Sequence, residues 1–119
     1  MADTTDAFAT GLEVTRDSGF AALRGKRVGL LTNPSAVDAH LESAYRILTG
    51  DARVFVACLL APEHGFAAAA PDAEHIASGV DARTGLPVHS LYGDNRRPTA
   101  EMLAGLDAVV CDIQDVGVR

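Results

Sequence analysis

Positive charge is scarce in this sequence of 119 residues. Lys26 is the only lysine, and 10 Lys and Arg residues stand against 16 Asp and Glu residues, which gives a net charge of −6. A surface that binds a nucleic acid backbone needs clustered Lys and Arg side chains. The composition therefore predicts that nucleic acid is not a partner.

Cysteines and long apolar runs are also few. The two cysteines, Cys58 and Cys111, lie in short apolar runs, and we expect both to be small buried thiols in a reducing compartment. No apolar run is long enough to cross a bilayer. The opening residues 1–6 carry acids where a secretory signal would be basic. The sequence predicts a cytoplasmic chain with no membrane partner.

Two familiar cofactor and metal patterns are missing. No Gly-x-Gly-x-x-Gly follows the first expected strand, where the turn is Asn33-Pro34-Ser35, and this counts against a dinucleotide. A metal-dependent hydrolase using His64, His75, His89 and Asp112 is conceivable, but these residues lack a compact spacing such as His-Glu-x-x-His. We therefore predict no cofactor and no metal site.

The sequence does contain short apolar runs of the length of strands, separated by segments of helical pattern. The runs lack apolar and polar alternation, which is typical of strands buried on both faces. A helix is expected between the first two, from about residue 40 to residue 48, with Leu41, Tyr45 and Leu48 on one face. Strand, helix and strand at this spacing predict a right-handed βαβ unit with parallel pairing. The expected strands are residues 28–32, 54–60, 88–92 and 108–113.

Three smaller elements are predicted from local signals. Residues 11–15 are predicted to form a short edge strand after a loose leader at residues 1–10. Ser18 is expected to be the N-cap of a helix that runs to Leu23 and that Gly25 terminates. Thr99 is expected to cap a helix whose Met102, Leu103 and Leu106 face the sheet. The folded part would then run over residues 11–119.

Polar residues follow three of the expected strands. Glu63 and His64 come directly after Pro62, Asn33 follows the first strand, and Asp112 lies one residue before the end of the last. Ligands of open α/β sheets bind at the carboxyl ends of the strands. We expect these side chains to converge at one edge of the sheet, although Glu63 and His64 taken alone also fit a turn held by hydrogen bonds.

Six motifs in order along the chain resemble those of the NamZ-type (YbbC-like) exo-β-N-acetylmuramidases. The resemblance covers about residues 11–119 and implies an α/β fold, a Rossmann-like three-layer parallel sheet with helices on both faces, truncated before the family's C-terminal domain. The motifs are Gly29-Leu-Leu-Thr-Asn-Pro-Ser35, Pro62-Glu-His-Gly-Phe66, Thr84-Gly-Leu-Pro-Val88, Ser90-Leu-Tyr-Gly93, Arg97-Pro-Thr99 and Asp112-Ile-Gln-Asp-Val-Gly-Val-Arg119.

The resemblance also implies a reaction and the residues that perform it. The activity is release of terminal N-acetylmuramic acid from muropeptides or related saccharides in cell-wall recycling, within a cleft that the C-terminal domain completes. Glycoside hydrolysis uses two carboxyl groups, and the matching positions are Glu63, as general acid, and Glu74. The remaining residues are implied to bind substrate: Asn33, His64, Asp112, Asp115 and Arg119.

One segment departs from the family pattern and leaves an alternative open. Ala67 to Ala70 stand where the family has a polar Arg-Gly-Asp-like segment, so a cation and an acid are absent from the edge of the cleft. A non-catalytic α/β module that binds a sugar or a partner explains both this loss and the short chain. Under either hypothesis we expect the isolated fragment to be inactive.

Overall fold

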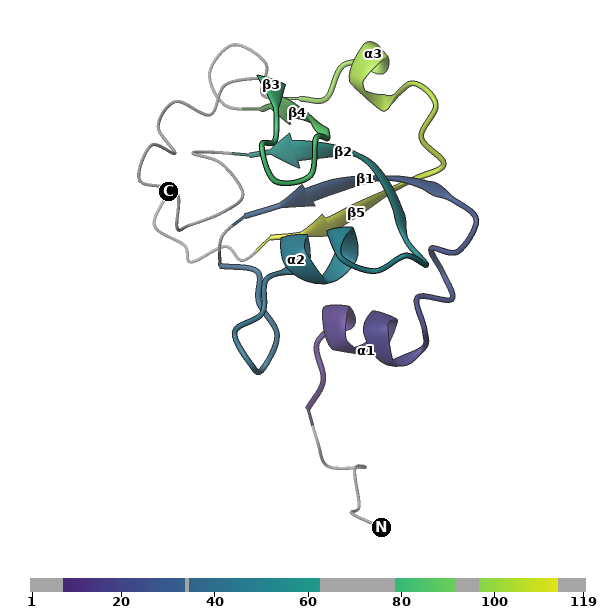
Figure 1. Ribbon diagram of the computed structural model, residues 1–119, viewed down its shortest axis with the longest axis vertical. Coiled ribbons are helices and arrows are strands. Elements are labelled where there is room, and N and C mark those ends of the chain that lie inside the picture. The colour runs from purple at the N-terminus through teal and green to yellow at the C-terminus, as the bar shows by residue number, and fades with distance from the viewer. Residues whose placement is uncertain (1–7, 34, 63–78, 92–96, 114–119) are drawn as a thin grey trace.

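The computed structural model describes residues 8–33, 35–62, 79–91 and 97–113, in which five strands form one sheet (Figure 1). The strand order is β3-β4-β2-β1-β5, and all pairs are parallel except β3 with β4. The strands are β1 (Arg27–Thr32), β2 (Phe55–Ala61), β3 (Gly79–Val80), β4 (Pro87–Ser90) and β5 (Ala108–Asp112), and the helices are α1 (Gly11–Asp17), α2 (Ala44–Thr49) and α3 (Ala100–Leu103). The predicted α/β class and the strands at 28–32, 54–60 and 108–113 are confirmed.

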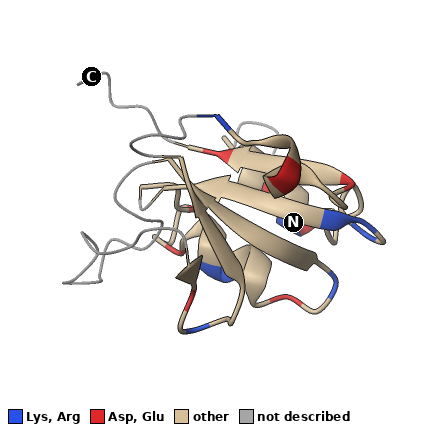
Figure 2. Ribbon diagram, turned by 90° about the horizontal axis from the view of Figure 1, so that it is seen from above, with Lys and Arg blue, Asp and Glu red and all other residues tan. Residues whose placement is uncertain are grey.

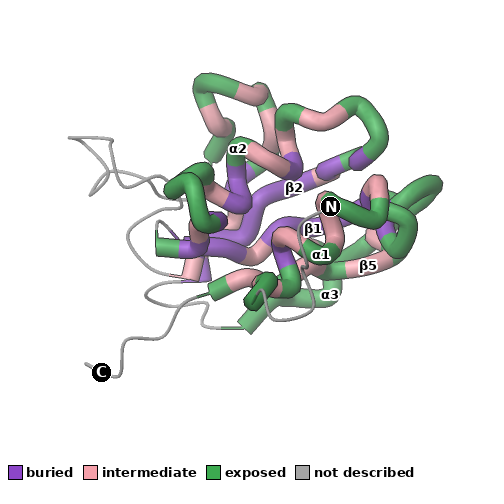
Figure 3. The backbone as a smooth tube through the Cα atoms, turned by 90° about the horizontal axis from the view of Figure 1, so that it is seen from below, coloured by how far each residue is buried: buried purple, intermediate pink, exposed green. Residues whose placement is uncertain are grey.

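The connections between parallel strands use both faces of the sheet. The chain crosses from β1 to β2 over the face that carries α2, and it crosses back from β4 to β5 over the opposite face, where α3 lies (Figure 3). Two right-handed crossovers that run in opposite directions across a sheet must lie on opposite faces of it. We call these the α2 face and the α3 face.

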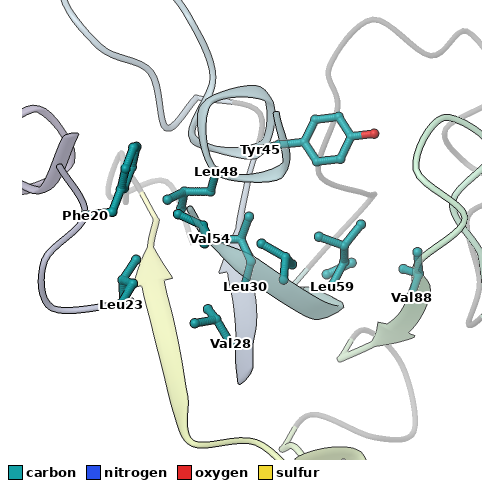
Figure 4. Close-up of a cluster of buried hydrophobic side chains, with 11 residues drawn as sticks. Phe20, Leu23, Val28, Leu30, Tyr45, Leu48, Val54, Leu59 and Val88 are labelled. Carbon is teal, nitrogen blue, oxygen red and sulfur yellow. The ribbon is translucent and has the colours of Figure 1, made fainter. Parts of the chain in front are cut away.

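The main core lies on the α2 face (Figure 4). Val28 and Leu30 of β1 and Leu59 of β2 are fully buried there against Leu48 of α2. Apolar burial is the dominant stabilising term in folding, which explains why a helix of only six residues is held in place. Within the strands, charged residues stand only at strand ends, with Arg27 at the start of β1 and Asp112 at the end of β5, away from the centre of the sheet (Figure 2).

The α3 face is covered unevenly. Over β1, a Cβ on Gly29 would come within 2.7 Å of Leu106 Cδ1, so the segment after α3 packs directly on this strand. Over β5, by contrast, Val109 is 45% exposed and Cys111 is exposed. The prediction of two buried thiols is therefore right for Cys58 and wrong for Cys111, because β5 is an edge strand among the described residues.

The pairing of β1 with β2 contains one irregularity. Val28 pairs with Val56 and Gly29 with Cys58, so Ala57 has no partner in β1. This is the two-against-one pattern of a β-bulge. Val56 and Leu59 both still contribute to the α2-face core.

The edge strand predicted at residues 11–15 is wrong, since these residues form α1. Thr10 and Glu13 make a reciprocal capping box: the Glu13 amide donates to Thr10 Oγ1 at 3.2 Å, and the Thr10 amide donates to Glu13 Oε1 at 2.9 Å. The sequence Thr-x-x-Glu is a signature of this motif. The capping box therefore sets these residues in a helix, whose buried residue is Leu12.

The helix predicted from Ser18 to Leu23 is also wrong. Ser18 is the C-cap of α1, and the chain then turns through positive φ angles at Gly19 (71°) and Phe20 (59°). A left-handed Phe is sterically unfavourable. Burial of the Phe20 ring to 1% exposure compensates, since this ring contributes to the main core.

The helix predicted from residue 40 begins later, with Ser43 as its N-cap. Asp38 Oδ1 accepts hydrogen bonds from the amides of His40 (2.8 Å) and Glu42 (2.9 Å) and thereby holds a turn. Side chains of this type compete with helix formation. Tyr45 and Leu48 are buried as predicted, but Leu41 is 80% exposed, with φ at 65°.

The helix capped by Thr99 is confirmed but is only four residues long. The Met102 amide donates to Thr99 Oγ1 at 3.2 Å. None of its residues is buried, and Leu103 is 36% exposed. Leu106, one of the three residues expected to face the sheet, lies against β1 at Gly29.

The first testable prediction compares two Leu→Ala substitutions. Leu30→Ala should lower the free energy of unfolding by about 2 to 5 kcal/mol, because it leaves a cavity in the main core. Leu41→Ala is the matched control and should change it little, since Leu41 is 80% exposed. Urea denaturation of both variants measures the difference, and equal losses would contradict the assignment of the core to the α2 face.

Candidate functional site

The candidate site is the edge of the sheet at which β1, β2, β4 and β5 all end. Because these four strands are parallel, their carboxyl ends share one edge. The register aligns Thr32 of β1 with Asp112 of β5, and Ala61 of β2 with Ser90 of β4. Residues that follow these four positions therefore leave the sheet side by side.

The direction of the chain across the sheet reverses between β1 and β5. From β1 it proceeds to β2 and β4, and β5 then adds to the other side of β1. Such a switch point opens a crevice outside the carboxyl ends of the two strands, where ligands of open α/β sheets bind. The residues nearest this crevice are those that end β1 and β5.

Thr32 and Asn33 occupy the end of β1. Thr32 is 1% exposed and Asn33 is 9% exposed. Ser35 Oγ donates to Asn33 Oδ1 at 3.3 Å, and the Ala36 amide donates to the Asn33 carbonyl at 3.1 Å. The Asn33 side chain is thus held at the edge of the sheet by the turn that follows the strand.

Asp112 ends β5 next to Thr32. It is half-buried, and its burial raises the pKa of the carboxyl group above the ordinary value. It borders a cavity of about 290 Å³ between α1 and β5, whose lining includes Leu12, Leu23 and Val110. These apolar neighbours account for the desolvation, since a low-polarity environment disfavours the charged carboxylate.

The loop after β1 is anchored to α1 by one ion pair and one hydrogen bond. Arg16 of α1 donates from Nη1 to Asp38 Oδ2 at 2.7 Å, and the Asp38 side chain is 2% exposed. The Glu42 amide and the Arg16 guanidinium lower the pKa of Asp38 despite its burial. The Ala39 amide adds a bond to Glu13 Oε2 at 2.9 Å. The capped helix α1 therefore fixes the loop that leaves the candidate site.

Two of the predicted site residues, Asn33 and Asp112, are thus brought to the same edge of adjacent strands. The remaining five lie outside the described residues: Glu63, His64, Glu74, Asp115 and Arg119. Glu63 follows directly in sequence on Pro62, which comes one residue after β2 ends at that edge. Its role as general acid stays a prediction.

Sequence reasoning missed two features next to these residues. Ser90, which belongs to the motif Ser90-Leu-Tyr-Gly93 but was not predicted as a site residue, ends β4 at the same edge, because the strand stops before residue 92, where it was expected to end. Tyr45 Oη donates to Asp81 Oδ2 at 2.5 Å and accepts from Arg83 Nε at 2.9 Å, a network that ties residues 81–84 to α2. Its members are 36 and 38 residues apart in sequence, so no local pattern could have shown it.

Within the described ranges, no group of three or more His, Cys, Asp and Glu side chains is placed to hold a metal ion. No helix of these ranges has the length and apolar character to cross a bilayer.

The parallel sheet and its polar carboxyl edge define an α/β protein with the ligand-binding architecture of doubly wound folds. Residues 28–119 match the family described as exo-beta-N-acetylmuramidase NamZ, N-terminal. The chain belongs to this family, and the resemblance noted in its motifs is confirmed.

Three relatives illustrate the match. The peptidoglycan beta-N-acetylmuramidase NamZ of Bacillus subtilis (strain 168) is 41% identical over 110 residues, which are 92% of this chain and 27% of that protein. Crystal structures of two DUF1343 family proteins from Bacteroides fragilis NCTC 9343 also match. One has a TM-score of 0.79 at 48% identity and 92% coverage of this chain, and the other a TM-score of 0.68 at 28% identity and 93% coverage. The chain spans 27% of the length of each of these relatives.

The second testable prediction concerns the carboxyl group of Asp112. Because its pKa is raised in the folded chain, its contribution to the free energy of unfolding is largest below the unfolded pKa and declines as the pH rises through the folded pKa. Asp112→Asn removes this decline, so the variant should gain stability relative to the unsubstituted chain between about pH 3 and pH 7.

Urea denaturation across this pH range measures the effect. Asp17→Asn serves as the control, since the Asp17 side chain is 73% exposed. A stability difference for Asp112→Asn that does not change with pH would show that the carboxyl group is not desolvated.

Proposed function

We propose that this chain is the N-terminal part of a glycosidase that releases terminal N-acetylmuramic acid from peptidoglycan fragments. The observation that carries the proposal is the 41% identity, over 92% of the chain, to a relative named as a peptidoglycan beta-N-acetylmuramidase. The polar carboxyl edge of the sheet, where Asn33 and Asp112 end adjacent strands, supports it, because this is where such a fold binds a ligand. The substrate is a muropeptide or another saccharide that ends in N-acetylmuramic acid.

In the proposed mechanism, Glu63 protonates the oxygen of the departing sugar. A general acid must be held close to the bond that breaks, and Glu63 is separated from the end of β2 by Pro62 alone. Proline fixes its own φ angle, which restricts where the next residue can lie relative to the strand. Glu74 is the proposed second carboxylate, acting at the anomeric carbon either directly or through water.

The other proposed residues hold the sugar. Asn33 offers an amide at the end of β1, and Asp112 offers a carboxylate that can accept hydrogen bonds from sugar hydroxyls. His64 and Asp115 are proposed to extend this set. Arg119 is proposed to bind the lactyl carboxylate of muramic acid, for which the planar guanidinium is suited.

The proposed enzyme needs more chain than these 119 residues. The relatives are much longer than the matched region, which makes up 27% of their length. A further domain closing over the carboxyl edge would exclude water and position the sugar, which a one-sided platform does not achieve. We place the reaction in the cytoplasm, in the recycling of cell-wall fragments.

The third testable prediction is that the 119-residue chain alone does not measurably hydrolyse a chromogenic N-acetylmuramic acid glycoside. The protein extended to the length of the relatives should hydrolyse it. Release of the chromophore by purified samples of both lengths gives the comparison. If the short chain proved to be as active as the long one, the need for a closing domain would be refuted; binding of the sugar without hydrolysis by both would favour the non-catalytic module.

The fourth testable prediction concerns Glu63 in the extended protein. Glu63→Gln keeps the size of the side chain but removes the transferable proton, so turnover should fall by roughly a hundredfold or more. The assay should use a muramic-acid-terminated disaccharide as well as the chromogenic substrate, because a good leaving group needs less protonation. Glu101→Gln, on the exposed surface of α3, is the control and should retain full turnover. Unchanged turnover of Glu63→Gln on both substrates would move the acid elsewhere, with Glu74 as the next candidate.

A further inference from the structure

A cavity of about 610 Å³ lies on the exposed side of α2 and is lined by arginines from four parts of the chain. Cavities of this size are typical of sites for small molecules. Arg16 comes from α1, Arg46 from α2, Arg53 from the segment before β2, and Arg83 from the segment between β3 and β4. The whole chain has 10 Lys and Arg residues and a net charge of −6, so this is an unusual concentration of positive charge. We call it the α2 cavity.

Two of these arginines are paired with a carboxylate that also lines the cavity. Arg16 contacts Asp38 at 2.7 Å. Arg53 donates to both oxygens of Asp51, from Nε at 2.9 Å and from Nη2 at 2.8 Å. These two pairs leave no net charge of their own.

The other two arginines have no carboxylate in contact among the described residues. Arg83 donates to the hydroxyl groups of Tyr45 (2.9 Å) and Thr49 (2.6 Å). Asp81 accepts from the same Tyr45 hydroxyl, so it partly offsets the charge of Arg83. Arg46 is exposed, and its side chain makes no hydrogen bond or ion pair with the described part of the chain. The charge of Arg46 is therefore available to a ligand.

A fifth arginine, Arg24, stands next to Arg53. A Cβ atom on Gly19 would lie 3.1 Å from Arg24 Nη2 and 3.4 Å from Arg53 Nη1, so the two guanidinium groups flank one point above this glycine. Like charges this close repel each other. Hydrogen bonds from Arg53 and, to a smaller extent, the charge of Arg24 lower the pKa of Asp51 to about 2. Asp51 supplies one negative charge to two guanidinium groups, which leaves an excess of one positive charge.

The guanidinium groups of Arg24 and Arg53 also keep free donors at this point. Arg53 uses Nε and Nη2 on Asp51, and Arg24 uses Nε on the Gly19 carbonyl at 2.9 Å. Among the described residues, no acceptor contacts Arg53 Nη1 or either terminal nitrogen of Arg24. Arg53 is held in place by stacking on the ring of Phe20, at 5.1 Å from its centre. The donors are therefore positioned before any ligand binds.

We infer that Arg24 and Arg53 bind the phosphate group of a small ligand and that the rest of this ligand lies in the α2 cavity. A carboxylate matches one guanidinium fork, as Asp51 does, whereas a phosphate group has three terminal oxygens and can accept from two. Its charge of about −2 would offset the excess at Arg24 and Arg46, of which Glu42, the third acid of the lining, can offset only one.

The charge of the whole chain sets the size of the ligand. A net charge of −6 would repel a long polyanion over most of the surface, so the local excess of arginine suits a small phosphate compound. The inference does not depend on the proposed reaction.

Isothermal titration calorimetry of the 119-residue chain tests the inference directly. Inorganic phosphate, ribose 5-phosphate, ribose and acetate are titrated at one ionic strength. Inorganic phosphate should bind saturably, ribose 5-phosphate should bind more tightly because the cavity holds its sugar, and ribose should not bind.

Three results of this titration would overturn the inference. The first is the absence of saturable phosphate binding. The second is binding of acetate as tight as that of phosphate, which would indicate a site for carboxylates. The third is binding of ribose 5-phosphate no tighter than that of inorganic phosphate, which would exclude the α2 cavity from the site.

A matched pair of substitutions locates the site. Arg24→Gln should weaken phosphate binding by at least about tenfold, because it removes charge-assisted hydrogen bonds to the ligand. Arg97→Gln removes the same charge from an exposed position before α3 and should leave the affinity unchanged. Equal affinities of the two variants for phosphate would place the anion elsewhere and refute the assignment.

Protection of the arginines from phenylglyoxal gives a second measure on the unsubstituted chain, so it does not depend on how well a variant folds. Mass spectrometry locates the modified residues. Inorganic phosphate should slow the modification of Arg24 and Arg53 and should not change that of Arg97. A rate of modification at Arg24 that phosphate does not alter would contradict the inference.

Discussion

Parallel hydrogen bonding on both sides of β1 is the interaction on which the rest of the structure depends. This strand pairs with β2 on one side and β5 on the other. Its backbone amides and carbonyls are thereby satisfied while Val28 and Leu30 are withdrawn from water, and an unpaired backbone group at such a depth would be costly. The helices contribute only short covering segments, so the sheet, and β1 within it, sets the position of everything else.

The same pairing creates the candidate site. The direction of the chain across the sheet reverses at β1, so the ends of β1 and β5 are adjacent. The connection that leaves β1 and the connection that enters β5 lie on opposite faces of the sheet. Asn33 and Asp112 therefore lie at the same edge of the sheet, although 79 positions separate them along the chain. Strand pairing is sufficient to bring them there, so no direct bond between their side chains is needed. The contacts that α1 makes with the following loop, through Arg16 and Asp38, then hold the boundary of that region in place.

Sequence reasoning succeeded where burial decides structure and failed where side chains compete for backbone amides. The central strands were predictable because Val28 to Leu31 and the run in β2 contain no polar side chain. The turn at Asp38 displaced the start of α2, and the Thr10 and Glu13 capping box made a helix of residues read as a strand. At the site, strand ends could be predicted from parallel topology. The burial of Asp112 could not, because it depends on Leu12 and Leu23, which are remote in sequence.

Because of its bulge, β2 should tolerate the deletion of one residue during evolution better than β1 does. Ala57 is the residue that pairs with nothing in β1, so its loss would leave Val56 and Cys58 as consecutive partners of Val28 and Gly29. The side chains on either side would keep their faces. β1 contains no such unpaired residue. Because strand side chains alternate with a period of two, a deletion in β1 would turn every side chain beyond it to the opposite face of the sheet. Homologues should therefore differ in length at position 57 more readily than anywhere in β1.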